Sequence, residues 1–341
     1  MTKSAAIIGG GIGGLATANY LVQHGWIVDV FERSAALPDT GTALGMWPEA
    51  LVALDAIGVG DRVRSIGSQQ KHGLFRRADG STLAKIDIRD TAVLISRPRL
   101  LESLASTLPD GIVKFSTTID NVADLGGYDV IVGADGVNSR VRTAVVGHQV
   151  DPEFLGFSAL IGRAHGTTDT VAETWDEEKI FGISPRDGGV TNWFAAYRQP
   201  ADGRMPADPM AFLRSNFGHW HSDVTELLDR IDTNSFIHYN VKQMPKLDSY
   251  VRGNIALIGD SAHAMAPNLG RGACETLIDA ATLGQALVSH DVDEALRRYD
   301  RKRRKHTQRL LTGARLMSKA AMSTRFNGPR DAAIRVVSKF A

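Results

Sequence analysis

The residues Ala5-Ala-Ile-Ile-Gly-Gly-Gly-Ile-Gly-Gly14, near the start of the chain, are the most informative segment of the sequence. The first four form an apolar run that predicts a buried strand, which the glycines end. Apolar side chains then recur at helical spacing from Leu15 to Val22, and Gly25 ends the predicted helix. The β-rich run from Trp26 to Phe31 stops at Glu32. A strand, helix and strand of these lengths open a doubly wound nucleotide-binding sheet.

The glycines of this segment fit the spacing G-x-G-x-x-G at Gly9, Gly11 and Gly14. In such a motif the first glycine permits a tight turn, the second lets the backbone approach a pyrophosphate, and the third lets helix and strand pack closely. The helix N-terminus offers unpaired N–H groups to the phosphates. Glu32 is placed to accept hydrogen bonds from ribose hydroxyls. The motif predicts a dinucleotide site, although a glycine-rich turn can be purely structural and both FAD and NAD satisfy it.

Two later segments repeat the pattern of an apolar strand followed by glycine. Tyr128 to Gly133 leads into Asp135-Gly136, and Asn254 to Ile258 leads into Gly259-Asp260. A carboxylate at the carboxyl end of a strand, such as that of Asp260, could hold a polyol like the ribityl chain of FAD, or it could simply cap a helix. The long helical pattern that starts near Gly272 would present its N-terminus to an anionic group.

The segments between these strands have a different character. Residues 72–90 alternate around the hairpin signal Asp79-Gly80, and residues 151–246 hold aromatic and β-branched stretches. We expect a mostly antiparallel second domain inserted into the nucleotide-binding one. The predicted division is 1–71, 92–150 and 247–290 for the nucleotide-binding domain, 72–91 and 151–246 for the inserted sheet domain, and 291–341 for C-terminal helices.

Composition narrows the classes of protein to which the chain could belong. Its 341 residues are 43% hydrophobic and 23% charged, with a formal net charge of +1. This balance gives no attraction to nucleic acid or to a membrane surface, and no stretch approaches the roughly 18 apolar residues that span a bilayer. The single cysteine, Cys274, fits a reducing cytoplasm. The basic residues between Arg297 and Lys305 are interpreted as a solvated helix face.

The order of the motifs resembles that of the group A FAD-dependent monooxygenases, the family of para-hydroxybenzoate hydroxylase. The segments that carry the resemblance are Gly9–Gly14 with Glu32-Arg33, Gly45-Met-Trp-Pro48, Ile95-Ser-Arg97, Gly133–Arg142 and Gly259–Ala280. The resemblance implies an α/β fold with a Rossmann-like FAD-binding domain, an inserted, mostly antiparallel β-sheet substrate domain and C-terminal helices. It assigns FAD to Gly9, Gly11, Gly13, Gly14, Glu32, Arg33, Gly45, Arg97, Asp135, Gly259, Asp260, Pro267, Gly270, Arg271 and Gly272.

The sequence departs from the family pattern near the expected flavin. Arg271 stands where glutamine is usual, Cys274 where asparagine is usual, and Ile278 where glutamate is frequent. Glu49 stands where asparagine is frequent. These changes concern the details of flavin contacts more than FAD binding itself. His263, within the last motif, is interpreted as a structural residue and not as a catalytic base.

The resemblance also implies a reaction. NADH or NADPH would reduce FAD, and the reduced flavin would react with O2 to form a C4a-hydroperoxide that hydroxylates or epoxidises a small aromatic or unsaturated substrate. We expect no metal and a monomer or homodimer, and the sequence identifies no catalytic base. The predicted substrate pocket is lined by Met46, Phe181, Trp193, Tyr197 and Pro267. Two alternatives stay open, namely an FAD-dependent dehydrogenase or reductase and a non-catalytic flavin-binding regulator.

Overall fold

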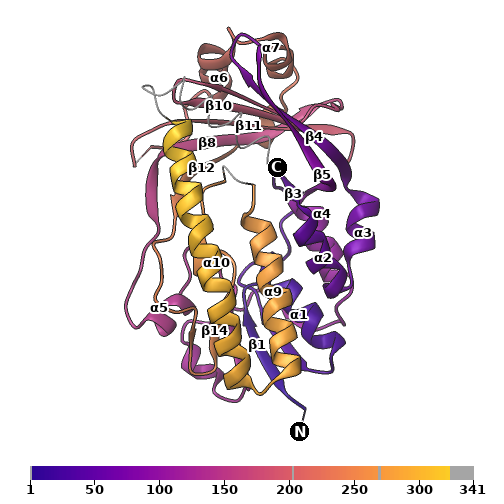
Figure 1. The fold of residues 1–341 in the computed structure, drawn as a ribbon, viewed down its shortest axis with the longest axis vertical. Helices are drawn as coiled ribbons and strands as arrows, with labels where there is room; N and C mark the ends of the chain where they lie inside the picture. The colour runs from indigo at the N-terminus through magenta and orange to yellow at the C-terminus, as the bar shows by residue number, and fades with distance from the viewer. Residues whose placement is uncertain (1, 202, 268–269, 323–341) are drawn as a thin grey trace.

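The structure is a computed structural model that describes residues 2–201, 203–267 and 270–322 (Figure 1). The described part is built around two sheets, a smaller one near the N-terminus and a larger one at the other end of the molecule. Helices α9 and α10 extend from the level of the smaller sheet toward the larger one (Figure 1). Within the described part, no helix has the length and apolar character needed to span a membrane.

The smaller sheet has six strands in the order β13-β14-β7-β1-β2-β6. Its strands are β1 (Ser4–Ile8), β2 (Ile27–Phe31), β6 (Val113–Lys114), β7 (Val130–Gly133), β13 (Val251–Arg252) and β14 (Ile255–Leu257). All neighbours are parallel except β13 and β14. The apolar runs therefore form a sheet covered on both faces, as their lack of alternation predicted.

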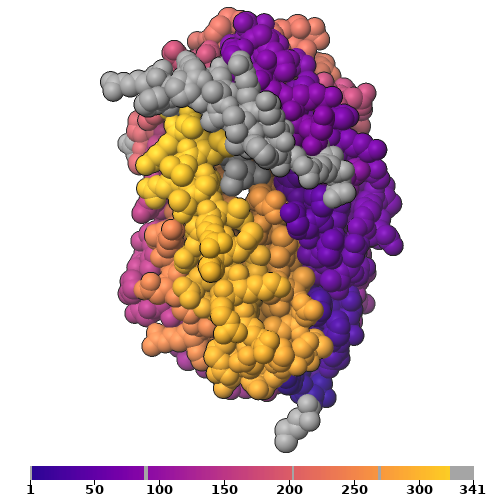
Figure 2. Space-filling view, in the orientation of Figure 1, coloured from indigo at the N-terminus to yellow at the C-terminus, as the bar shows by residue number. Residues whose placement is uncertain are grey.

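The helices of this half pack on the small sheet and on one another. They are α1 (Ile12–Gln23), α2 (Pro48–Ile57), α3 (Gly60–Ile66), α4 (Arg97–Ala105), η1 (Val122–Leu125), α5 (Val141–Val146), α8 (Asp260–His263), α9 (Gly272–Ser289) and α10 (Val292–Ala321). α9 contacts α1, α2 and α10. In the space-filling view, the yellow surface of α10 runs along one side of the molecule up to the large sheet (Figure 2).

The larger sheet has eight strands in the order β12-β8-β11-β10-β9-β4-β5-β3. Its strands are β3 (Ala43–Met46), β4 (Ser68–Arg77), β5 (Thr82–Ser96), β8 (Glu153–His165), β9 (Ala172–Asp176), β10 (Lys179–Arg186), β11 (Val190–Arg198) and β12 (Ile237–Gln243). The pairs are antiparallel except β4 with β9, which confirms the mostly antiparallel prediction. The predicted domain boundaries at 72 and 91 fall inside β4 and β5, and the domain division stays a prediction.

The two faces of the large sheet pack against different partners. The outer face carries Phe181, Trp193 and Tyr197 and packs against α6 (Pro209–Phe217) and α7 (Ser222–Leu228), which lie at the top of Figure 1. The sequence did not predict these two helices, nor the short η2 (Thr233–Ser235). The inner face carries Trp175, Ile180, Phe194 and Ala196 and packs with Ala266 and with Ala314 of α10. The inner face is therefore the one turned toward the nucleotide-binding half.

Candidate functional site

The glycine turn after β1 has the geometry that its spacing predicted. Gly9 has a positive φ of 108°, and a Cβ on Gly14 would lie 1.9 Å from the carbonyl oxygen of Gly9. A Cβ on Gly11 would meet no protein atom within 4 Å. α1 has no side-chain cap and no acidic residue in its first turn. Its N–H groups and positive dipole end are open to an anion, so the residues present fit the pyrophosphate of FAD.

Glu32 ties the end of β2 to this turn. Its carboxylate accepts hydrogen bonds from Gly10 N at 2.7 Å and from Ser34 N at 2.8 Å. Desolvation raises the pKa of Glu32, but these hydrogen bonds and the charge of Arg33 outweigh it, and the net effect lowers that pKa. Arg33 itself is exposed. Glu32 is therefore ionised beside the turn, with acceptor capacity left for ribose hydroxyls.

Asp260 and Arg97 come together from distant parts of the sequence. Asp260 begins α8 directly after Gly259, which has a positive φ of 59°. The Asp260 side chain is exposed to solvent. The surrounding protein nevertheless desolvates its carboxylate and raises its pKa, and the charges of His263 and Arg97 oppose this rise in smaller measure. A solvent-reachable carboxylate enclosed by protein on several sides is what a recessed ligand site presents. Arg97 is exposed at the N-terminus of α4, and its N–H donates to Thr42 O at 3.0 Å.

The loop before α9 lies against the segment that begins at Gly45. Trp47 Nε1 donates to Gly270 O at 3.3 Å, and Cys274 Sγ donates to Gly45 O at 3.0 Å. Burial raises the pKa of the Cys274 thiol to about 11, which makes it a packing residue and not a reactive thiol. The structure thus brings the segment that contains Gly45 against the loop before α9. Pro267, Gly270 and Gly272, which the resemblance assigned to FAD, lie in that loop and at the first residue of α9.

Arg271 is held at the start of α9 by acidic side chains. Its Nε donates to Glu275 Oε1 at 3.0 Å, and one of its terminal nitrogens lies 3.6 Å from a carboxylate oxygen of Glu49. A guanidinium therefore occupies the loop where the family pattern has an uncharged amide.

Asp135 lies next to the glycine turn, since a Cβ on Gly9 would lie 3.1 Å from the Cα of Asp135. Its carboxylate accepts hydrogen bonds from Ser139 Oγ at 2.6 Å and from the backbone N–H groups of Arg140 and Val141 at 2.7 and 3.2 Å. These contacts cap the first turn of α5. The contacts of Asp135 that the structure describes are thus structural.

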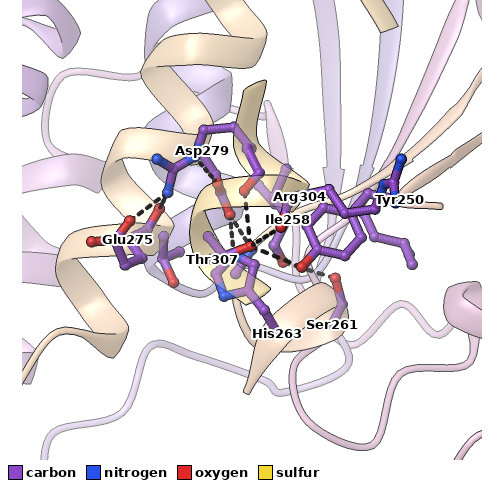
Figure 3. Close-up of polar contacts among 12 residues, drawn as sticks. Tyr250, Ile258, Ser261, His263, Glu275, Asp279, Arg304 and Thr307 are labelled. Carbon is purple, nitrogen blue, oxygen red and sulfur yellow. Dashed lines mark hydrogen bonds and ion pairs between the residues drawn. The ribbon is translucent and has the colours of Figure 1, made fainter. Parts of the chain in front are cut away.

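A buried ionic network is hydrogen-bonded to the Gly259 turn (Figure 3). Asp279 Oδ2 accepts from Gly259 N at 2.9 Å and shares a 2.6 Å hydrogen bond with His263 Nε2, while Arg303 Nε of α10 donates to Asp279 Oδ1 at 2.5 Å. Arg303 also donates to Glu275 Oε2 at 2.6 Å. Desolvation raises the pKa of Asp279, but the charges of and hydrogen bonds from His263 and Arg303 outweigh it and lower that pKa to about 2. The buried His263 is therefore part of the scaffold, as predicted.

The structure does not bring together the five residues predicted to line a substrate pocket. Met46 is completely buried in a core cluster with α1 and α2, and Phe181, Trp193 and Tyr197 are buried on the outer face against α6 and α7. Only Pro267 lies exposed at the predicted place. The prediction for the three aromatic residues was wrong because both faces of the large sheet are covered, so aromatic character alone does not reveal which face a residue occupies. The prediction for Met46 was wrong because its side chain packs into the core with α1 and α2.

Two sets of hydrogen bonds join the β10–β11 segment to the start of β3 and the end of β5, within the large sheet. Asn192 Oδ1 accepts from Thr42 Oγ1 and Ala43 N, both at 3.0 Å. Asp187 accepts from Ser96 N at 2.6 Å and from Ser96 Oγ at 2.9 Å. These contacts hold the β10–β11 hairpin over β3 and the start of α4.

A cavity of about 160 Å³ opens beside this junction, with Arg163 and Arg186 in its lining. Arg163 pairs with Asp232 at 2.9 Å. Desolvation lowers the pKa of Arg186, Asp187 opposes this, and the charge of Arg163 adds to the lowering. In the part of the chain that the structure describes, no group of three His, Cys, Asp or Glu residues could hold a metal ion.

Comparison with known proteins agrees with this geometry. The model of the FAD binding domain family matches residues 2–108 and 128–314. The chain belongs to this family. Its relatives are group A flavoprotein monooxygenases, which makes the chain a flavoprotein oxidoreductase with FAD as its cofactor.

Several relatives resemble the chain over most of its length. It is 27% identical to aurachin C monooxygenase/isomerase of Stigmatella aurantiaca, over 86% of the chain and 83% of that protein. It is 25% identical to 6-hydroxynicotinate 3-monooxygenase of Pseudomonas fluorescens, over 83% of the chain and 82% of that protein. It is 31% identical to the chloroplastic zeaxanthin epoxidase of Solanum lycopersicum, over 82% of the chain, and spans about half of that protein (47%).

Solved structures show the same fold. Klebsiella pneumoniae HpxO, complexed with FAD and uric acid, matches with a TM-score of 0.88 at 22% identity, over 99% of this chain and 93% of that one. A salicylate hydroxylase in a substrate complex matches with a TM-score of 0.82 at 22% identity, over 99% of this chain and 95% of that one. At these identities the likeness concerns the fold.

Proposed function

We propose that this chain hydroxylates or epoxidises a small aromatic or unsaturated molecule held between the inner face of the large sheet and the loops of the FAD site. One observation carries this proposal. The inner face packs through Ala266 next to the loop that contains Pro267 and Gly270, so an apolar wall adjoins the place where the flavin ring would lie. An apolar wall with few polar groups is typical of a site for a small organic ligand.

The residues present divide the work of holding FAD. The N–H groups at the start of α1 would bind the pyrophosphate, Glu32 the adenosine ribose, and Asp260 the hydroxyls of the ribityl chain. The N-terminus of α9 and the guanidinium of Arg271 would place positive charge beside the flavin. When bound, FAD supplies the redox chemistry with NADH or NADPH and O2, which side chains do not perform.

The protein's own contribution to the reaction is position and the exclusion of water. Trp175, Ile180 and Phe194 are apolar side chains on the wall that faces the site. Such a wall keeps water from the reacting groups and so protects the reductant from unproductive loss. The cytoplasm remains the proposed compartment, because Cys274 is a free, buried thiol. A monomer or homodimer remains the proposed assembly.

Isotope incorporation tests the proposed function. The purified protein would be reconstituted with FAD, reduced anaerobically with NADH or with NADPH, and mixed with ¹⁸O2 and a panel of phenols, indoles, quinolones and isoprenoids. We expect one labelled oxygen atom in a product, and faster flavin reduction by one nicotinamide than by the other. Reoxidation that releases only peroxide across the whole panel would favour a dehydrogenase or reductase. Absence of flavin reduction by either nicotinamide would favour a regulator.

A further inference from the structure

Glu173 is an acidic side chain on the inner face of the large sheet. It lies opposite Gly182 in the β9–β10 ladder and opposite Phe75 in the β4–β9 ladder. Side chains alternate along a strand, so Glu173 shares a face with Trp175 and points away from Thr174, which bonds to a residue at the start of α7. Trp175 belongs to the inner-face cluster. Glu173 therefore lies on the wall that faces the nucleotide-binding half.

Aromatic rings are the neighbours of this carboxylate. Phe75 and Trp175 meet edge to face, with ring centroids 5.6 Å apart. The ring of Phe194 covers Gly182, because a Cβ added to Gly182 would lie 1.9 Å from a ring carbon of Phe194. Glu173 is thus set among three aromatic side chains, on a face that carries polar residues such as Asn192 and Arg186 further along its strands.

Among the described residues, no cation forms an ion pair with Glu173. Trp175 Nε1 donates a 2.9 Å hydrogen bond to Glu173 Oε2, and no other polar contact to this carboxylate exists among the described residues. Arg77 of β4 and Arg186 of β10 also belong to the strands around it, and neither forms an ion pair with it. Desolvation raises the pKa of Glu173, and the hydrogen bond from Trp175 opposes this in smaller measure.

A structural role alone does not account for a carboxylate here. A neutral amide would accept the hydrogen bond from Trp175 at a much lower desolvation cost, because an ionised group in apolar surroundings is stable only when it is paired. The Glu173 side chain is half-buried, so it is not sealed within the sheet. A perturbed, partly accessible carboxylate in a ligand-facing wall indicates a functional group.

We propose that Glu173 accepts a hydrogen bond, and then the proton, from a phenolic O–H or ring N–H of an uncharged aromatic substrate packed against Phe75, Trp175 and Phe194. This inference rests on the proposed function, since it names the substrate class and the proton acceptor of that reaction. The O–H or N–H bond breaks, Glu173 gains the proton, and the electron pair stays on the substrate. The ring becomes more electron-rich and reacts more readily with an electrophilic oxygen.

A matched pair of ligands tests the assignment. The FAD-loaded protein would be titrated with 2-naphthol and with 2-methoxynaphthalene, which differ in the O–H group, and binding would be followed by the change in absorbance of the bound flavin. The variants are Glu173→Gln and, as a control on the exposed turn that follows β9, Glu177→Gln. FAD content would be measured first in each protein.

We expect the wild type and Glu177→Gln to bind 2-naphthol at least about tenfold more tightly than its methyl ether, since a hydrogen bond to a charged acceptor is about twice as strong as a neutral one. In Glu173→Gln this preference should fall to within about threefold. The assignment of Glu173 is overturned if the preference is unchanged in Glu173→Gln, or if the wild type shows no preference. If FAD content is normal in that case, the proposed function stays intact. Failure of the wild type to retain FAD overturns the proposed function itself.

Discussion

Two glycines of the first turn have different physical roles although they belong to one motif. A Cβ on Gly14 would lie 1.9 Å from a backbone oxygen, whereas a Cβ on Gly11 would meet no protein atom within 4 Å. Gly14 therefore serves the packing of α1 on β1. Gly11 leaves open space at the start of α1, which suits the close approach of a pyrophosphate to the backbone.

This difference predicts opposite responses to alanine. Gly14→Ala should lower the free energy of unfolding of the FAD-free protein by about 1–3 kcal/mol, because the backbone must shift. Gly11→Ala should leave that free energy within about 1 kcal/mol of the wild type but weaken FAD binding at least about tenfold. Urea unfolding and FAD fluorescence titration measure the two quantities. Gly11→Ala with wild-type FAD affinity would contradict the role of the turn.

At the level of elements, α10 stabilises the Gly259 turn through Asp279, which binds both Gly259 N and Arg303. Arg303 is 5% exposed and pairs with the fully buried acids Glu275 and Asp279 on α9, whereas the adjacent Arg304 is 35% exposed and pairs with Asp300 on its own helix. Removing one partner of a buried ion pair leaves an uncompensated charge, while an exposed pair along one helix contributes little. The contact between α9 and α10 therefore depends on Arg303 far more than on its neighbour.

The matched variants are Arg303→Met and Arg304→Met. We expect Arg303→Met to lower the free energy of unfolding by about 3–5 kcal/mol and Arg304→Met by less than about 1 kcal/mol. Because Asp279 also accepts the hydrogen bond from Gly259 N, Arg303→Met should in addition weaken FAD binding. Equal losses of stability in the two variants would show that the buried network does not determine the contact between α9 and α10.

For the whole molecule, the network predicts sensitivity to acid. The pKa of Asp279 is lowered to about 2 in the folded state, against about 3.9 for an unfolded aspartate. The unfolded chain therefore takes up the proton more readily, so stability from Asp279 is complete above about pH 4 and is lost as the pH falls toward 2. Asp260 and Glu173 have raised pKa values and contribute with the opposite sign.

Urea unfolding at pH 6, 4 and 3 measures this contribution. Between pH 6 and pH 3 we expect the wild type to lose roughly 1 kcal/mol of stability through Asp279. Asp279→Asn should be less stable at pH 6 and should show a smaller further loss, whereas Asp110→Asn, at an exposed position, should follow the wild type. An identical loss in Asp279→Asn and the wild type would assign the acid sensitivity to other groups.

The amino-acid sequence was sufficient for the first strand–helix–strand unit and for the strands that follow Tyr128 and Asn254. Strand β1, the glycine turn and α1 depend on contacts between residues close in sequence, and the positions of Gly9, Gly11 and Gly14 follow from backbone sterics. The later motifs at Gly259 and Gly272 likewise combine a strand end with a helix start. Local patterns of this kind carry their structural meaning within a few residues.

Only the tertiary structure decided which side chains face the substrate site. Both faces of the large sheet are buried, so the alternation along β10 and β11 does not show whether Phe181 or Phe194 lies inward. That choice depends on α6 and α7, which cover the outer face, and on Ala266, which meets the inner one. The position of Glu173 follows from the same choice, because Phe75 and Phe194 lie on other strands and come close to it only in the folded sheet.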